Sequence, residues 1–434
     1  MNTKNNQHPD IAKGLARPPP LAYIVYTFVS LFLFYEMALQ VSPSIITEQL
    51  MRDLHIDAVY IGIISGIYFY SYVFMQIPSG LLFDRYPARL LISIAILVCA
   101  IGTLFFATSS TALQAAVGRL LMGVGSACAF IAVLVVSSRW FPATYFAFLA
   151  GIAQLLGAAG AMGGEAPLAI FINILGWRSA LTWLVGIGII LAVIIWIFLK
   201  NEPPRRVQVE PVLQRKLSSA WQDLKTALCS SQGWWIAIYA FCSWAPAATF
   251  ASLWGVPYLM ALYHISSTLA ATACSMIWIG LMMGSPLFGW YSSKVGKRLP
   301  LLRGAALLGL VTSLIVIYVP QLPFLLMCLF LLGFGVAISG QILTFALVNE
   351  NSHPTVMATA IGFNNMAVVA GGAVFQPLVG TLLGLAWNGK VVNGTALYTV
   401  NNYRLALCVV PLCFLIGWIT SLTCIRETFC RVKY

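Results

Sequence analysis

Three charged residues lie inside long apolar stretches of this sequence: Glu36, Arg119 and Glu165. A carboxylate or guanidinium group is expensive to bury in hydrocarbon, so it normally faces a partner or an aqueous cavity and is a functional candidate by default. A carboxyl group can also bind and release a proton as its surroundings change between wet and dry. The three residues are therefore candidates for proton coupling.

Glu36 and Arg119 are predicted to lie at similar depth. At a rise of about 1.5 Å per residue, Glu36 would lie about 24 Å into its helix. The stretch that holds Arg119 runs the opposite way and places it about 21 Å from the same face of a slab about 30 Å thick. We expect them to contact each other or a common solute; the alternative is a structural pair that joins two helices. Glu165 is predicted near the other face, close in depth to Arg178, as part of a gate or a structural pair.

Further polar residues follow helical spacing in the apolar stretches. Glu36 and Gln40 are four residues apart, and Tyr68, Tyr72 and Gln76 repeat at intervals of four, so each set lies on one face of a helix. Such side chains bind solutes or, as the simpler alternative, join helices by hydrogen bonds. The candidate solute-binding residues are Glu36, Gln40, Tyr68, Tyr72, Gln76, Gln154, Gln341, Asn364 and Asn365.

The composition requires a membrane around these residues. Hydrophobic residues make up 60% of the 434 residues and charged residues 8%, whereas a soluble domain carries about 25% charged residues. About twelve stretches reach the roughly 20 residues that cross the hydrocarbon layer. The sequence therefore predicts an all-α polytopic membrane protein with twelve transmembrane helices. The predicted spans are 21–45, 58–82, 90–108, 113–137, 145–171, 179–199, 234–262, 268–291, 301–319, 323–348, 356–385 and 403–425.

The net charge of +12 follows from membrane topology. If both termini are cytoplasmic, only five of the 24 Lys and Arg residues lie on or near the outer side, namely Arg52, Arg119, Arg178, Lys390 and Arg404. This asymmetry is the positive-inside bias that orients membrane proteins. A nucleic-acid partner is therefore not expected.

The chain divides into two related halves. Residues 200–232 hold six Lys or Arg residues and three Pro, as a cytoplasmic linker between a half at 1–199 and a half at 233–434 would. Landmarks of the first half recur about 210 positions later: Gly123-x-Gly125 as Gly333-x-Gly335, and Pro167 as Pro377. Internal repeats of this kind are typical of transporters that bind their solute between the repeats, near the middle of the membrane.

A loop motif that follows the second span strengthens this interpretation. Residues 80–89 (GLLFDRYPAR) resemble the signature loop of the major facilitator superfamily, although Pro87 replaces the usual second glycine. The copy at 289–298 (GWYSSKVGKR) has Ser293 where the motif has Asp. The resemblance implies the major facilitator fold, with two six-helix halves and an inner gate. The residues that it assigns to the gate are Gly80, Asp84, Arg85, Arg89, Gly289 and Arg298.

Four segments resemble one branch of that superfamily more closely. They are 41–44 (VSPS), 68–72 (YFYSY), 75–80 (MQIPSG) and 176–178 (GWR), and they are similar to the phagosomal transporter (Pht) branch of intracellular bacteria. The resemblance implies a multi-pass protein of the bacterial inner membrane that imports amino acids or nucleosides. Relatives carry a basic residue near the position of Gln40, so their carboxylate site does not transfer directly.

The same residues exclude several function classes. No nucleophile–base set and no metal-ligand cluster is visible, so neither an enzyme nor a metal or other cofactor is expected. An ion gradient, by preference of protons, would drive alternating access. The expected partners are a small-molecule substrate and membrane lipid, and the protein is expected to be a monomer. An amino acid is the leading substrate; a nucleoside, an organic anion and a non-transporting membrane sensor are the alternatives.

Lys216→Cys tests the predicted topology in a cysteine-depleted background. Because the positive-inside rule places residues 200–232 in the cytoplasm, an impermeant thiol reagent should label this cysteine in inverted vesicles and leave it unlabelled in intact cells. Strong labelling in intact cells would overturn the topology.

Overall fold

A computed structural model describes residue 18 and residues 20–141, 146–199, 230–320, 322–352, 357–392 and 395–430. Twelve helices in these ranges are long and apolar enough to cross a membrane, which confirms the predicted all-α polytopic fold. The strands of the described part are β1 (Val391–Val392) and β2 (Thr395–Ala396), which form a short antiparallel hairpin. Of the predicted linker, residues 200–229 lie outside the described ranges, and the boundaries of the halves remain a prediction.

Six spans form the first half, and several of them consist of more than one helix. Their elements are α1 (Pro20–Val41), the 3₁₀ turn η1 (Ser42–Ile45), α2 (Thr47–Leu54), α3 (Ala58–Arg85), α4 (Ala88–Ala107), α5 (Ala112–Trp140), α6 (Phe146–Gly163), α7 (Ala166–Leu175) and α8 (Trp177–Phe198). The second half is built likewise. Its elements are α10 (Ser231–Pro246), the π-helical η3 (Ala247–Trp254), α11 (Gly255–Tyr263), α12 (Ser267–Val295), α13 (Leu299–Tyr318), α14 (Phe324–Ile338), η4 (Ser339–Gln341), α15 (Ile342–Asn351), α16 (Met357–Ala386), α17 (Val400–Ala406) and α18 (Val409–Thr423).

Short polar residues fix where several helices begin. The side chain of Asp57 accepts a hydrogen bond from the backbone N–H of Tyr60 and caps α3, and Thr111 caps α5 in the same way. Ser266 caps α12. The first N–H groups of a helix have no partner within it, so these side chains satisfy donors that hydrocarbon would leave unpaired.

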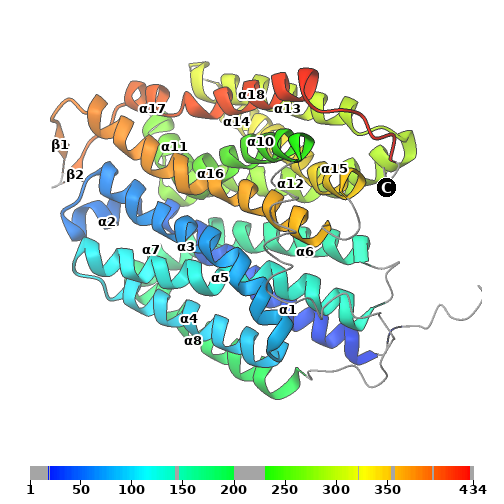
Figure 1. Ribbon diagram of the computed structural model, residues 1–434. Coiled ribbons are helices and arrows are strands. Elements are labelled where there is room, and N and C mark those ends of the chain that lie inside the picture. The colour runs from blue at the N-terminus through cyan, green and yellow to red at the C-terminus, as the bar shows by residue number, and fades with distance from the viewer. Residues whose placement is uncertain are drawn as a thin grey trace, which may run out of the picture.

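The two halves lie side by side, and α1 begins at the same end of the bundle at which the described chain ends (Figure 1). We call this the terminal end. The opposite end, which carries α2, the β1–β2 hairpin and α17, is the far end (Figure 1). The charge bias predicts that the terminal end is cytoplasmic.

Helices α3 and α16 join the halves closely at the far end. A Cβ atom at Gly62 would lie 2.6 Å from the carbonyl oxygen of Gln376, and one at Gly380 would lie 2.4 Å from that of Ala58. Glycine permits this approach because it has no side chain, as is common where membrane helices pack. A hydrogen bond of 3.0 Å from the backbone N–H of Ala58 to the Tyr398 hydroxyl also crosses between the halves there.

Candidate functional site

A cavity lies between the two halves and receives residues from both. The empty volume of the cavity is about 610 Å³, and this volume includes solvent at the open side. One part of its wall is polar and the other is apolar, with Phe130, Trp244, Leu281 and Val368 among the apolar residues. The polar residues that line it are Glu36, Gln40, Tyr72, Gln154, Gln341 and Asn365. All six belong to the set that the sequence predicted as solute-binding or proton-coupling.

Glu36 lines this cavity, and its two carboxyl oxygens differ in their hydrogen bonds. Its Oε1 accepts a hydrogen bond of 2.5 Å from the Tyr68 hydroxyl. Its Oε2 is buried and accepts no hydrogen bond from the described residues. Gln40, one helical turn further along α1, has a buried Nε2 that is also without a partner among them. The cavity wall therefore carries a carboxyl group and an amide group one helical turn apart, and both can bind a solute.

Arg119 is fully buried, but it does not pair with Glu36. Its Nη1 donates to the carbonyl oxygen of Leu39 at 3.1 Å, and its Nη2 donates to that of Gln40 at 3.3 Å. The Leu39 carbonyl would normally accept from the N–H of residue 43, but this residue is Pro43 and has no N–H group. The cation therefore binds carbonyl groups at the end of α1, and it shares the Leu39 carbonyl with the Ser42 hydroxyl, which donates to it at 2.9 Å.

Tyr68 lies between the two charged residues. Its hydroxyl donates to Glu36, and the Arg119 guanidinium lies 4.5 Å from the centre of its ring. The predicted direct contact between Glu36 and Arg119 is thus wrong, although one aromatic side chain connects them. The similar depth predicted for Glu36 and Arg119 agrees with their common contact to Tyr68. Residue spacing could not predict the directions in which their side chains point.

The remaining predicted polar residues have different positions. Gln76 accepts a hydrogen bond of 3.0 Å from Asn365 and so joins α3 to α16 across the halves. Asn364 donates to the Thr344 hydroxyl at 3.0 Å, within the second half, and is not among the residues that line the cavity. Trp244 lines the cavity but was not among the residues that the sequence predicted for it. Its position in the middle of a span, away from the interface where Trp anchors normally lie, was the available signal.

Glu165 lies at the far end and contacts the other half. Its Oε1 accepts from the Trp278 indole N–H at 2.9 Å, and its Oε2 lies 3.1 Å from the Ser275 hydroxyl. Arg178, which has a similar predicted depth, pairs instead with Asp53 at 2.6 Å. Of the two predicted roles, the contact with α12 agrees with a gate between the halves.

Polar contacts between the halves lie at the far end or beside the cavity. Asn173 donates to the Thr268 hydroxyl at 2.5 Å, near the Glu165 contacts. Between described residues, no hydrogen bond or ion pair crosses the halves on the terminal side of the Gln76–Asn365 contact. The described polar contacts thus join the halves toward the far end and beside the cavity.

The predicted gate segment of the first half is described only in part. Gly80, Asp84 and Arg85 belong to the last turns of α3, but the side chains of Asp84 and Arg85 lie outside the described residues. The Arg89 guanidinium lies 4.4 Å from the centre of the Trp196 ring. A Cβ atom added at Gly80 or Gly289 would meet no atom within 4 Å. The role of this segment as a gate remains a prediction.

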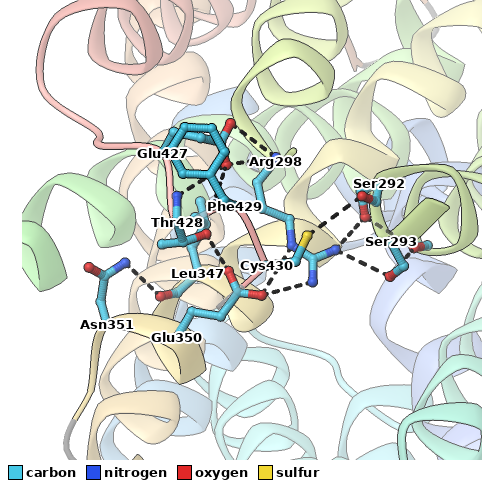
Figure 2. Close-up of polar contacts among 11 residues, drawn as sticks. Ser292, Ser293, Arg298, Leu347, Glu350, Asn351, Glu427, Thr428, Phe429 and Cys430 are labelled. Carbon is cyan, nitrogen blue, oxygen red and sulfur yellow. Dashed lines mark hydrogen bonds and ion pairs between the residues drawn. The ribbon is translucent and has the colours of Figure 1, made fainter. Parts of the chain in front are cut away.

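The copy of this motif in the second half is bound to the end of the chain. Arg298 donates to Glu350 at 2.8 Å and to the Ser292 hydroxyl at 2.5 Å (Figure 2). The Glu427 carboxylate accepts from the backbone N–H groups of Arg298 and Leu299, at 2.9 and 2.8 Å, and so caps α13 (Figure 2). All these residues belong to one half. Arg298 therefore stabilises that half in this conformation and does not itself connect the halves.

The surroundings of Glu427 favour its charged form. Burial raises the pKa of its carboxyl group, but the backbone N–H groups of Arg298, Leu299, Phe429 and Thr428 outweigh burial and hold the pKa below its ordinary value. A carboxyl group with a lowered pKa in the folded state stabilises the protein above its unfolded pKa, and this contribution is lost as the pH falls through the folded pKa.

Comparisons with known proteins agree with this architecture. The Major Facilitator Superfamily model matches residues 24–376, so the chain belongs to this superfamily. The Hexuronate transporter of Bacillus subtilis (strain 168) is 23% identical over 371 residues, which cover 82% of this chain and 84% of that protein. The Uncharacterized transporter YybO of the same strain is 26% identical over 194 residues, but the match spans only 44% of this chain and 43% of that protein.

A solved structure shares the fold. It is a bacterial homolog of the human lysosomal transporter Spinster in an inward-facing and occupied conformation, with a TM-score of 0.74 and 16% sequence identity over 93% of this chain and 97% of that chain. Together these findings support a secondary transporter of the superfamily in a membrane. The Pht branch, the inner membrane and the cytoplasmic termini remain predictions.

Glu427→Ala should lower the thermal stability of the purified protein, because it removes the group that caps α13. We expect a loss of about 0.5–2 kcal/mol near neutral pH, the usual range for a lost helix cap. The difference from wild type should shrink as the pH falls below the ordinary range of Glu, where the wild-type carboxylate becomes protonated. Thermal unfolding measured over a pH series checks this.

Arg426→Ala is the matched control, because the exposed Arg426 uses its backbone N–H, and not its side chain, to bind Gln232. Equal stability losses in both variants would contradict the capping role of Glu427.

Proposed function

Because the chain belongs to the Major Facilitator Superfamily, we propose that it carries a small carboxylate-bearing solute, with an amino acid as the leading substrate, together with a proton bound at Glu36. One observation carries the proposal. Glu36 and Gln40 line one cavity, and the Glu36 Oε2 and the Gln40 Nε2 are buried without a hydrogen-bond partner among the described residues. A buried polar atom without a partner is costly, so a bound solute would stabilise both.

Protonation converts this pair of groups into a carboxylate site. A protonated Glu36 has an O–H donor, and Gln40 contributes an N–H donor one helical turn away. Two adjacent donors suit the two oxygens of a carboxylate. A charged Glu36 would repel the same group. Solute binding would therefore require the proton, and both would cross the membrane when the halves exchange which end is open.

The rest of the cavity favours a solute with an apolar part. Tyr72 and the amides of Gln154, Gln341 and Asn365 offer acceptors for an ammonium group, whereas Phe130, Trp244 and Leu281 offer apolar surface. A sugar acid such as the hexuronate named for the Bacillus subtilis relative carries hydroxyl groups that would remain unpaired against this surface. A nucleoside, which has base carbonyl groups and a flat ring, is the second candidate because three aromatic side chains line the wall, those of Tyr72, Phe130 and Trp244.

Glu36→Gln tests the coupling. The variant keeps a donor beside Gln40 and cannot exchange a proton, so it should bind solute at all pH values and lose pH-driven accumulation. It should retain exchange of labelled for unlabelled solute in proteoliposomes, because exchange moves no net proton.

Normal pH-driven accumulation by Glu36→Gln would contradict the coupling role. If Glu36 served only to hold α1 against α3, Glu36→Gln and Tyr68→Phe should lower the folded yield equally and leave the pH dependence of the remaining transport unchanged. Reconstituted transport and yield, measured together, separate the two outcomes.

A competition series tests the substrate class. Leucine should displace bound solute, whereas leucinol, which lacks the carboxylate, should compete about tenfold or more weakly, because charged hydrogen bonds contribute roughly 1.5–3 kcal/mol. Glucuronate should compete weakly because of its hydroxyl groups. Stronger competition by thymidine than by any amino acid would favour the nucleoside alternative.

A further inference from the structure

Glu165 is a second buried carboxyl group, and it does not face the cavity. It is completely buried, and no cation lies within ion-pair distance of it in the described part of the chain. It belongs to the first half, whereas both its partners, Ser275 and Trp278, belong to α12 of the second half. Leu281, one turn further along α12, lines the cavity. The Glu165 contacts therefore lie between the cavity and the far end.

A break in the helix directs Glu165 across to the other half. Helix α6 ends at Gly163, and α7 begins at Ala166. Pro167 has no N–H group for the Gly163 carbonyl, so the helical hydrogen bonds are interrupted here. The Glu165 side chain does not cap α7 and instead contacts α12. Such a break is also a place where α7 can move relative to α6.

The hydrogen bonds around Glu165 suit a protonated carboxyl group. The Ser275 hydroxyl has one hydrogen, and its oxygen lies 2.9 Å from the Ala271 carbonyl and 3.1 Å from the Glu165 Oε2. If Ser275 donates to Ala271, a proton on Oε2 completes the chain by donating to Ser275, while the Trp278 indole N–H donates to Oε1. A charged carboxylate here would be buried without a cation, which costs several kcal/mol.

Among the described residues, the neighbouring elements supply no group that offsets the charge of an ionised Glu165. On α12 the Cys274 thiol is the titratable group beside Glu165. The parts of α1 that pack against the break are Phe34, Ala38 and Val41, which do not titrate. Arg178, at the start of α8, forms an ion pair with Asp53.

We propose that Glu165 is a second proton-binding site, which holds the two halves together at the far end when it is protonated and allows them to separate when it is charged. Separation exposes Glu165 to water at the far end, where its proton can leave; a proton taken from that side allows the halves to close again. The proposal assumes the alternating access of the proposed transporter, but not that Glu36 couples transport.

Cross-linking across the far end tests this proposal without a substrate. Asn173→Cys and Thr268→Cys place one thiol in each half at a contact of 2.5 Å, in a protein whose accessible native cysteines have been replaced. Disulfide formation is then measured in proteoliposomes from about pH 6 to about pH 9, a range that reaches the titration of buried carboxyl groups. Because alkaline pH makes thiols more reactive, a decrease in cross-linking cannot come from the thiols themselves.

With Glu165 present, cross-linking should fall severalfold as the pH rises. Glu165→Gln should remain cross-linked at every pH, because the glutamine amide can donate to Ser275 and accept from Trp278 as the protonated acid does. Glu36→Gln is the matched control and should keep the wild-type pH dependence, so failure of the coupling proposal and failure of this one are distinguishable.

The proposal would be overturned if cross-linking of Glu165→Gln still depended on pH. It would also be overturned if this variant showed little cross-linking at every pH. If Glu165→Gln does not fold, Trp278→Phe provides the second variant. This variant removes one hydrogen bond to the carboxyl group and should reduce cross-linking at low pH. Unchanged cross-linking in Trp278→Phe would also contradict the proposed role of Glu165.

Discussion

The cation of Arg119 binds the last carbonyl groups of α1, and the arrangement of the cavity depends on this contact. Pro43 lacks the N–H group that would normally donate to the Leu39 carbonyl. The Ser42 hydroxyl donates to this oxygen instead, and Arg119 adds a second donor from α5. The same guanidinium lies against the Tyr68 ring, whose hydroxyl holds Glu36. One buried charge thus connects three helices, and the Glu36 side chain that Tyr68 holds lines the cavity.

The two intramembrane carboxyl groups differ in what surrounds them. Glu36 uses one oxygen for Tyr68 and leaves the other for the cavity, whereas both oxygens of Glu165 contact the opposite half. Environment commonly separates the roles of two carboxyl groups in one protein. Here the free oxygen suits a group that binds a solute or a proton directly. The contact across the halves suits a group that responds to their separation.

The ends of the bundle differ in a corresponding way. At the far end, glycines bring α3 and α16 into close contact and hydrogen bonds join the halves. At the terminal end, the strongest described polar network lies within the second half, where Arg298, Glu350 and Glu427 tie the chain end to α13 and α15. A half that is rigid in itself can move as a body against the other, which is how transporters built from repeats change access.

Sequence alone determined the twelve spans, their division into related halves and the polar residues of the cavity. Apolar length and charge bias are properties of single segments, and the solvent imposes them. It could not determine which charged residues meet, because that depends on helix rotation and on packing between segments far apart in the chain. Spacing suggested that Arg119 lies beside Glu36, but in the fold Tyr68 lies between them. Spacing also placed Arg178 at the depth of Glu165, but Arg178 forms an ion pair with Asp53. Only the tertiary structure placed Ser275 and Trp278 at Glu165, because these residues lie 110 and 113 positions away in the chain and in the other half.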